Sequence, residues 1–172
     1  MLDRPLILTG FMGSGKSSVG RVLAERLGCR FVDLDAEIVA RAGRSINDIF
    51  AQDGEQAFRS MESACLARFL GGGRAVIATG GGVVVADDNR CSMRNHGVVV
   101  NLVVSIPQVL KRLHGAVDRP LFSECNTANS VKLLMDGREQ FYADADIRID
   151  TDGKSVEDVA AEILRFVEVL HA

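Results

Sequence analysis

The chain has 172 residues, 47% of them apolar and 25% charged, which is the balance of one soluble globular domain with a single core. Its formal net charge of −3 argues against a nucleic-acid partner, because nucleic-acid surfaces usually need a basic stripe. No apolar stretch reaches the roughly 20 residues of a membrane helix, and no signal peptide is visible, so we expect a cytoplasmic protein without a membrane partner.

Apolar β-branched runs alternate with helical patterns along the chain. Strands are expected at the following segments: Leu6–Thr9, Phe31–Leu34, Ala75–Ala78, Val98–Val103 and Ile147–Ile149. Helices are expected at residues 19–27 and 51–70, after Ser105, and from Ser155 onward. Because the strands are nearly continuous apolar runs that alternate with helices, we expect a parallel sheet covered on both faces, a three-layer α/β fold.

A glycine-rich segment joins the first strand to the first helix. It reads Gly10-Phe11-Met12-Gly13-Ser14-Gly15-Lys16-Ser17 and fits the phosphate-loop pattern G-x-x-x-x-G-K-[ST]. Glycines let the backbone point successive N–H groups at phosphate oxygens, and the helix N-terminus adds a partial positive charge. We expect Lys16 to reach the β- and γ-phosphates and Ser17 to bind Mg²⁺. The motif leaves GTPase, ATPase and kinase open.

Two carboxylates, Asp33 and Asp35, stand where the second strand is expected to end. Ligands of open α/β sheets bind at the carboxyl ends of strands. Asp33 could hold Mg²⁺, directly or through water, while Asp35 could accept a hydrogen bond or the proton from an attacking hydroxyl. The alternative is a pair of solvated acids at a strand end.

Three further features could bind an anion. Arg59 lies on the helix at 51–70 with Glu62 three residues later, and Arg138 lies near Tyr142. Gly80-Gly81-Gly82 follows the third strand, where three glycines allow a ligand to approach the backbone closely. Each feature has an ordinary alternative: a solvated arginine for the first two, and a flexible turn for the glycines.

The segment from His114 to Asn129 has weak periodicity and is either a surface loop or a mobile lid. It contains Arg119-Pro120-Leu121. An arginine on a mobile segment can neutralise charge on a transferred phosphoryl group, although a solvated loop arginine is the alternative.

In order and spacing, these motifs resemble those of shikimate kinases. The resemblance rests on the phosphate loop, Asp33-x-Asp35, Arg59-x-x-Glu62, Gly80-Gly81-Gly82, Arg119-Pro120-Leu121 and Arg138-x-x-x-Tyr142, over about residues 5 to 155. It implies a five-stranded parallel sheet in the order 2-3-1-4-5, with a substrate-binding segment at about 33–62 and a lid at about 112–126, all in one phosphate-loop kinase domain. It also implies a monomer that transfers the γ-phosphoryl group of ATP to the 3-hydroxyl of shikimate, on the route to chorismate and the aromatic amino acids.

The resemblance assigns roles to individual residues. Shikimate-binding roles fall on Asp35, Arg59, Gly80, Gly81, Gly82 and Arg138. ATP-binding roles fall on Gly13, Ser14, Gly15, Lys16, Ser17, Ser18, Arg112 and Arg119, with Arg112 stacked on adenine and residues 151–153 across the base. Mg²⁺ falls to Ser17 and Asp33, and the catalytic roles to Lys16, Asp35 and Arg119. Guanidinium forks match a planar carboxylate well, which agrees with an acidic acceptor.

Two alternatives stay open from the sequence. A gluconate kinase would share the scaffold, and the pair of arginines with the triple glycine argues against it. A sensor domain would bind both ligands without turnover, and the presence of Lys16, Asp33 and Asp35 argues against that.

Overall fold

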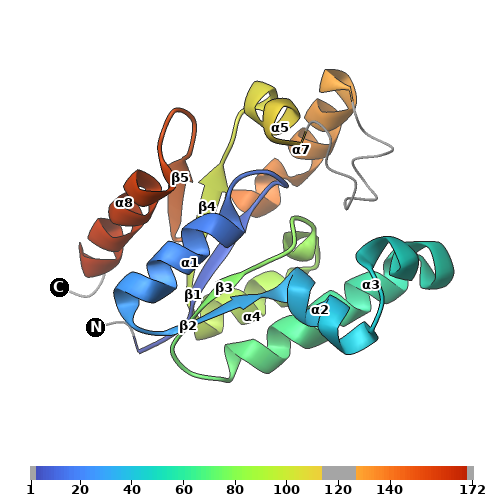
Figure 1. Ribbon diagram of the computed structural model, residues 1–172, viewed down its shortest axis with the longest axis horizontal. Helices are drawn as coiled ribbons and strands as arrows, with labels where there is room; N and C mark the ends of the chain where they lie inside the picture. The colour runs from blue at the N-terminus through green and yellow to red at the C-terminus, as the bar shows by residue number, and fades with distance from the viewer. Residues whose placement is uncertain (1–2, 114–126, 170–172) are drawn as a thin grey trace.

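The computed structural model describes residues 3–113 and 127–169, in which five parallel strands form one sheet (Figure 1). The strands are β1 (Leu6–Gly10), β2 (Arg30–Asp33), β3 (Ala75–Ala78), β4 (Val98–Val103) and β5 (Ile147–Asp150). Their spatial order is β2-β3-β1-β4-β5, and every neighbouring pair is parallel. The predicted fold class and strand order are confirmed.

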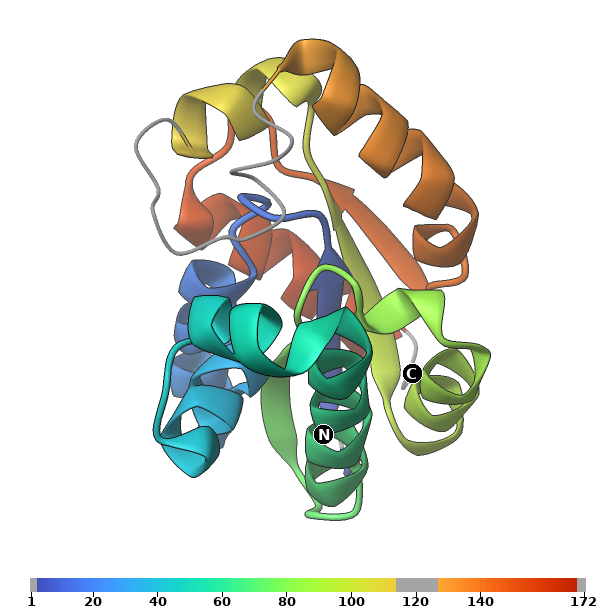
Figure 2. The ribbon, with the colours of Figure 1, turned by 90° about the vertical axis from the view of Figure 1, so that its right-hand side faces the viewer.

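Helices surround the sheet. They are α1 (Lys16–Leu27), α2 (Leu34–Ala42), α3 (Ile46–Leu70), the 3₁₀ helix η1 (Val83–Val85), α4 (Asp87–His96), α5 (Ile106–Leu113), α7 (Ala128–Tyr142) and α8 (Val156–Val169). Helices α1 and α8 cover one face of the sheet, while α3, α4 and α7 lie on the other (Figures 1 and 2). Within the described residues, no helix is long and apolar enough to cross a bilayer.

The strand interiors explain the three layers. Leu6 and Leu8 of β1 pack in the core under α1 and α8, whereas Ile7 between them packs in the core on the opposite face, and all three are at most 1% exposed. Side chains alternate along a strand, so an apolar residue at every position requires cover on both sides. The functional edge is therefore the rim where the strands end.

The second strand begins and ends one residue earlier in the chain than predicted. It ends at Asp33, and α2 begins at once with Leu34. The Asp33 carboxylate accepts hydrogen bonds from the amides of Asp35 (3.1 Å) and Ala36 (3.4 Å), so it caps the helix. The expectation that Asp35 ends a strand is wrong, because this cap turns the chain into a helix before Asp35 is reached.

Helix α3 extends beyond the predicted 51–70 and is bent. It starts after the capping box that the sequence itself indicates at Ser45 and Asp48, and it continues to Leu70 with Gly54 at φ +83° inside it. This φ is one that only glycine adopts readily, so the helix changes direction there. The part after Gly54 carries Arg59 and Glu62 towards the sheet.

Candidate active site

The first residue of the phosphate loop, Gly10, has no room for a side chain. Gly10 has φ +140°, and a Cβ there would lie 2.9 Å from Ser14 Oγ and 2.5 Å from the Leu102 carbonyl oxygen. Gly15 precedes α1 in the left-handed conformation, at φ +95°. These turns aim the loop amides and the N-terminus of α1 at one place, which is a ready anion site.

Lys16 lies across this loop. Its ammonium donates to the carbonyl oxygens of Gly10 (2.8 Å) and Phe11 (2.9 Å), with Ser14 Oγ at 3.4 Å. The positive charge is therefore held in the centre of the curl, where phosphate oxygens can replace the carbonyl partners.

Ser17 and Asp33 are brought together from two elements. The Ser17 hydroxyl donates to Asp33 Oδ2 at 2.6 Å, while the helix cap occupies Asp33 Oδ1. Both groups are hard oxygen donors, which suit Mg²⁺, an ion usually held by one or two protein oxygens together with substrate phosphates and water. In the described part of the chain, no group of three or more His, Cys, Asp or Glu is arranged to hold a metal ion.

Asp35 faces the triple glycine. Although it lies in the first turn of α2, its Oδ1 would be 3.0 Å from a Cβ added to Gly80. Any such Cβ would also collide with the Glu62 carboxylate. A glycine here lets two acids from different helices approach the same backbone without being displaced.

Partly exposed Arg59 forms an ion pair with buried Glu62 beside those glycines. Arg59 Nη1 lies 2.5 Å from Glu62 Oε2, and its Nη2 lies 3.0 Å from Glu55. Glu62 is only 1% exposed, and its other oxygen, Oε1, has no hydrogen-bonding partner among the described residues. A Cβ at Gly82 would meet the Arg59 guanidinium, so a larger residue there would displace that side chain.

Arg138 and Tyr142 of α7 lie beside Asp35, Arg59 and Glu62. We call these five residues the charged cluster. Arg138 is 7% exposed, and its guanidinium interacts with the Tyr142 hydroxyl and, through its charge, with Glu62. The Tyr142 hydroxyl donates to the Gly81 carbonyl at 2.5 Å. A helical arginine this buried needs a partner, and here the partners come from α3 and α7.

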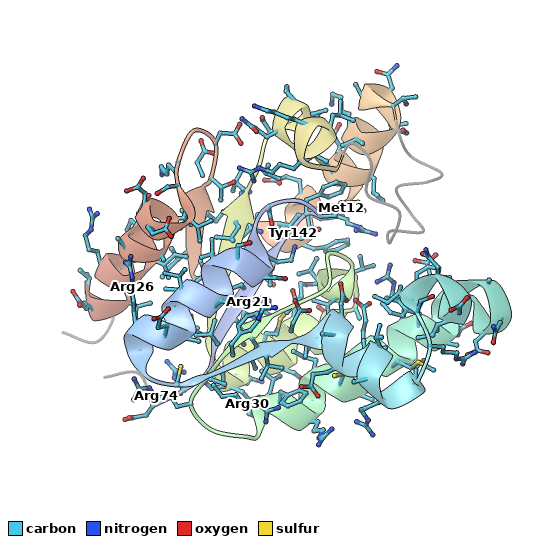
Figure 3. All side chains as sticks on the ribbon, in the orientation of Figure 1. Met12, Arg21, Arg26, Arg30, Arg74 and Tyr142 are labelled. Carbon is cyan, nitrogen blue, oxygen red and sulfur yellow. The ribbon has the colours of Figure 1, made fainter. Side chains whose placement is uncertain are left out.

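The triple glycine, Gly80-Gly81-Gly82, forms a loop that also contacts the phosphate loop, and we call it the glycine loop. A Cβ at Gly81 would lie 3.4 Å from the Met12 amide nitrogen, 3.5 Å from the Gly10 carbonyl oxygen and 3.7 Å from the Tyr142 hydroxyl. Met12 and Tyr142, both labelled in Figure 3, thus flank the same glycine. The phosphate loop and the charged cluster therefore meet at one residue, Gly81.

Burial and charge set the ionisation of the cluster. Burial raises the pKa of Glu62, and the Arg59 guanidinium offsets part of that rise. Burial alone would lower the pKa of Arg59, but Glu62 and Glu55 hold it above its ordinary value. Burial also raises the pKa of Tyr142 to about 12, so its hydroxyl keeps the proton that it donates to Gly81.

On the other side of the loop lies a cavity of about 220 Å³, which reaches from the phosphate loop to the end of β5. Its polar lining comprises Ser14, Ser18, Arg112, Thr151, Lys154 and Ser155. Arg112 donates to the Gly13 carbonyl oxygen at 2.9 Å. The arrangement brings Gly13, Ser18 and Arg112 next to residues that follow β5, where a nucleotide base was expected.

Comparison with known proteins identifies the family. A model of the family described as "SKI: Shikimate kinase" matches residues 12–168. The chain belongs to the shikimate kinase family. It is 57% identical to a shikimate kinase of Geobacter sulfurreducens, over 95% of this chain and 91% of that protein. It is 53% identical to that of Geobacter metallireducens, over 96% of this chain and 92% of that protein.

Solved structures agree. A shikimate kinase from Acinetobacter baumannii, determined in complex with shikimate, superposes with a TM-score of 0.93 at 34% identity, over 96% of this chain and 93% of that one. A gluconokinase from Sinorhizobium meliloti has a TM-score of 0.58 at 17% identity, which shows the shared fold alone. The predicted activity, ATP-dependent phosphorylation of shikimate, is confirmed, and gluconate is not supported as the acceptor.

The structure describes most, but not all, of the predicted site residues of this shikimate kinase. Most of these residues lie together at the carboxyl ends of β1, β2 and β3. Arg119 and the predicted lid from residue 114 to 126 lie outside the described residues, so their roles stay predictions.

Two further residues belong to the charged cluster. The sequence predicts only that Glu62 pairs with Arg59, and it assigns Tyr142 nothing beyond its spacing from Arg138. The four-residue interval between Arg138 and Tyr142 is a signal that was available, because residues at i and i+4 share a helix face.

Proposed function

We propose that this shikimate kinase binds shikimate between α2, α3, the glycine loop and α7, so that its 3-hydroxyl faces the γ-phosphate of ATP held by the loop around Lys16. The observation that carries the proposal is the border at Gly81, where the backbone of the phosphate loop meets the charged cluster. A ligand that spans this border has its acid on one side and its alcohol on the other.

The arginines would hold the acid. Arg59 and Arg138 reach the cluster from α3 and α7, and both interact with Glu62. Two guanidinium forks and a glycine amide can bind one carboxylate with charge-assisted hydrogen bonds, and this favours an acid over a neutral sugar. Glu62 keeps Arg59 in place, since their ion pair is largely closed to water.

Asp35 would act on the alcohol. Its carboxylate lies at the glycine loop, close to Gly80, and it is not consumed by the helix cap, which Asp33 supplies. It can accept the hydroxyl hydrogen and orient the oxygen in line with the γ-phosphorus. Phosphoryl transfer passes through a loose transition state, so orientation and charge neutralisation matter more than a strong base.

The nucleotide would lie on the other side of the border. Lys16 exchanges its two carbonyl partners for phosphate oxygens and neutralises charge as the γ-phosphoryl group moves. Ser17 and Asp33 would hold Mg²⁺, which supplies further charge neutralisation on the phosphates. Arg112 and the 220 Å³ cavity would receive the base, and the hydrogen bond from Arg112 to Gly13 supports this. Arg119 would close on the phosphate from the lid.

We also propose that the chain works as a monomer of one catalytic domain in the cytoplasm. The resemblance supports this, because family members of this size are usually monomers. Light scattering of the purified protein at assay concentration tests it, and a stable dimer would contradict it.

The test is ADP release, followed in a coupled assay with ATP, Mg²⁺ and either shikimate or gluconate. We expect turnover with shikimate and almost none with gluconate. Asp35→Asn should lower kcat by about 10²–10⁴-fold, the usual contribution of a positioned proton acceptor. Asp136→Asn, which changes an exposed carboxylate on α7, is the matched control. A folded Asp35→Asn protein with the wild-type kcat would remove Asp35 from the chemistry.

A further inference from the structure

The guanidinium of Arg90, on α4, binds the backbone of the residues that follow the glycine loop. Arg90 Nη1 donates to the carbonyl oxygens of Val84 (2.6 Å) and Val85 (3.0 Å) in η1, which directly follows Gly82. The neighbouring Asn89 donates to the Val83 carbonyl at 3.0 Å. All three carbonyls of η1 are therefore bound by side chains of one helix.

The same guanidinium also contacts the C-terminal end of α7. It lies over the Phe141 ring, 4.6 Å from its centroid, and its Nε is 3.6 Å from Asp144. Arg94, one turn further along α4, also pairs with Asp144. The two views of the ribbon show η1 against this end of α7, with α4 packed against η1 (Figures 1 and 2).

These contacts lie behind the charged cluster, not inside it. Tyr142 is bonded to Gly81, and Arg138 lies one turn before it on α7. The hydrogen bond from Tyr142 to Gly81 fixes the distance between the loop and α7 at one point, but by itself it does not fix the angle between them. Arg90 supplies the second attachment, between the residues that follow the loop and the residues that flank Tyr142.

The Arg90 contacts are of a kind that can hold geometry. Its side chain is only 14% exposed, although its partner Asp87 is 78% exposed, so the surface ion pair between them contributes little. The two backbone carbonyls and the ring use different edges and the face of one planar group. A lysine has one compact ammonium and cannot serve all of them together.

We propose that Arg90 is a positioning residue for shikimate recognition, because it fixes the distance and angle between the backbone of Gly81 and the guanidinium of Arg138. This inference rests on the proposed function, in which both groups bind the carboxylate. Arg90 itself touches neither substrate nor nucleotide.

The test compares Arg90→Met with Arg94→Met. Methionine keeps the apolar contact with Phe141 and removes the fork, while Arg94→Met removes a guanidinium that binds Asp144 but makes no bond to η1. Arg90→Met should raise the KM for shikimate about tenfold and leave the KM for ATP within about twofold, because only one subsite is displaced. Arg94→Met should change neither by more than about twofold.

A purely structural role would give a different pattern. Loss of stability lowers the fraction of active protein, and with it the apparent kcat and the binding stoichiometry, but leaves the KM and the Kd for shikimate unchanged. Isothermal titration with shikimate measures stoichiometry and Kd separately, and the Kd should rise with the KM. If Arg90→Met does not fold, Arg90→Lys is measured in the same way and should show the same rise.

The inference is overturned if the KM for shikimate stays within twofold of wild type, or if the KM values for shikimate and ATP rise together. Arg138→Met in the same assay separates the two levels of the argument. A rise for Arg138→Met without one for Arg90→Met removes only the positioning role. No rise for either variant removes the proposed shikimate site as well.

Discussion

The two halves of the active site are built in different ways. The phosphate loop is eight consecutive residues in which backbone amides, glycine turns and Lys16 converge. The charged cluster takes side chains from three helices, α2, α3 and α7, and places them against the glycine loop. The first half is local in the chain, whereas the second exists only when the fold is complete.

The difference extends to electrostatics. The loop offers dipoles and one cation to an anion, and it buries no acid of its own. The cluster already contains a buried carboxylate, Glu62, whose pKa is raised by burial although Arg59 lies beside it. A buried charge that loses its partner is costly, so the cluster should respond to single substitutions in both binding and stability.

The largest effect should come from the loop. Lys16→Met removes the charge that neutralises the transferred phosphoryl group and should lower kcat by about 10²–10³-fold, as loss of one transition-state donor does in other enzymes. Steady-state ADP release measures it. Lys132→Met, which alters an exposed lysine on α7, should behave as wild type. A kcat within a few-fold of wild type for Lys16→Met would place the critical charge elsewhere.

The second effect should come from the cluster. Arg59→Met and Arg138→Met should each raise the KM for shikimate roughly 30- to 150-fold. This corresponds to the loss of about 2–3 kcal/mol of charged hydrogen bonding. The KM for ATP should stay the same. Arg68→Met, on an exposed part of α3, is the control. If the affinity for ATP fell while the KM for shikimate held, the two arginines would belong to the nucleotide half.

The smallest effect should be a pH trend in stability. The raised pKa of Glu62 means that the folded protein holds this proton more tightly than the unfolded chain. Its contribution to stability is then present below the ordinary carboxyl pKa and is lost as pH rises through the raised pKa. The free energy of unfolding of wild type minus that of Glu62→Gln should therefore fall with rising pH.

Urea denaturation of both proteins at a series of pH values measures this difference. Ser63→Ala, at the position after Glu62 on α3, removes no titrating group and should show a flat difference from wild type. A difference that rises with pH for Glu62→Gln would mean that Arg59 outweighs burial in setting the pKa.

The local half could be predicted from the sequence because its pattern and its structure coincide. The phosphate loop, the five strands and the end of α1 at Gly28 follow from adjacent residues, and the structure has them within one residue at each strand end. The pairing of Ser17 with Asp33 also follows, since a loop after β1 and the end of β2 meet at one sheet edge.

The cluster could be anticipated only in part. Arg138 reads as a solvated helical arginine, and its burial depends on groups from residues 62 and 142 that become its neighbours on folding. Helices α2, α4 and α7 were not predicted as such. Helix α4 is dominated by polar residues, with only Asn89 and Met93 buried, so apolar periodicity could not reveal it. Arg90 on that helix could not be singled out without η1 and α7 in place.

The bend of α3 at Gly54 has a consequence for how this enzyme can change over evolutionary time. The turns from Ile46 to Asp53 follow a different axis from the turns that carry Arg59. Residues could be gained or lost before the bend without rotating that guanidinium. One residue inserted after it would swing Arg59 by about 100° around the helix, away from the substrate. Length variation among natural relatives should therefore be tolerated ahead of Gly54 and purged between Gly54 and Arg59.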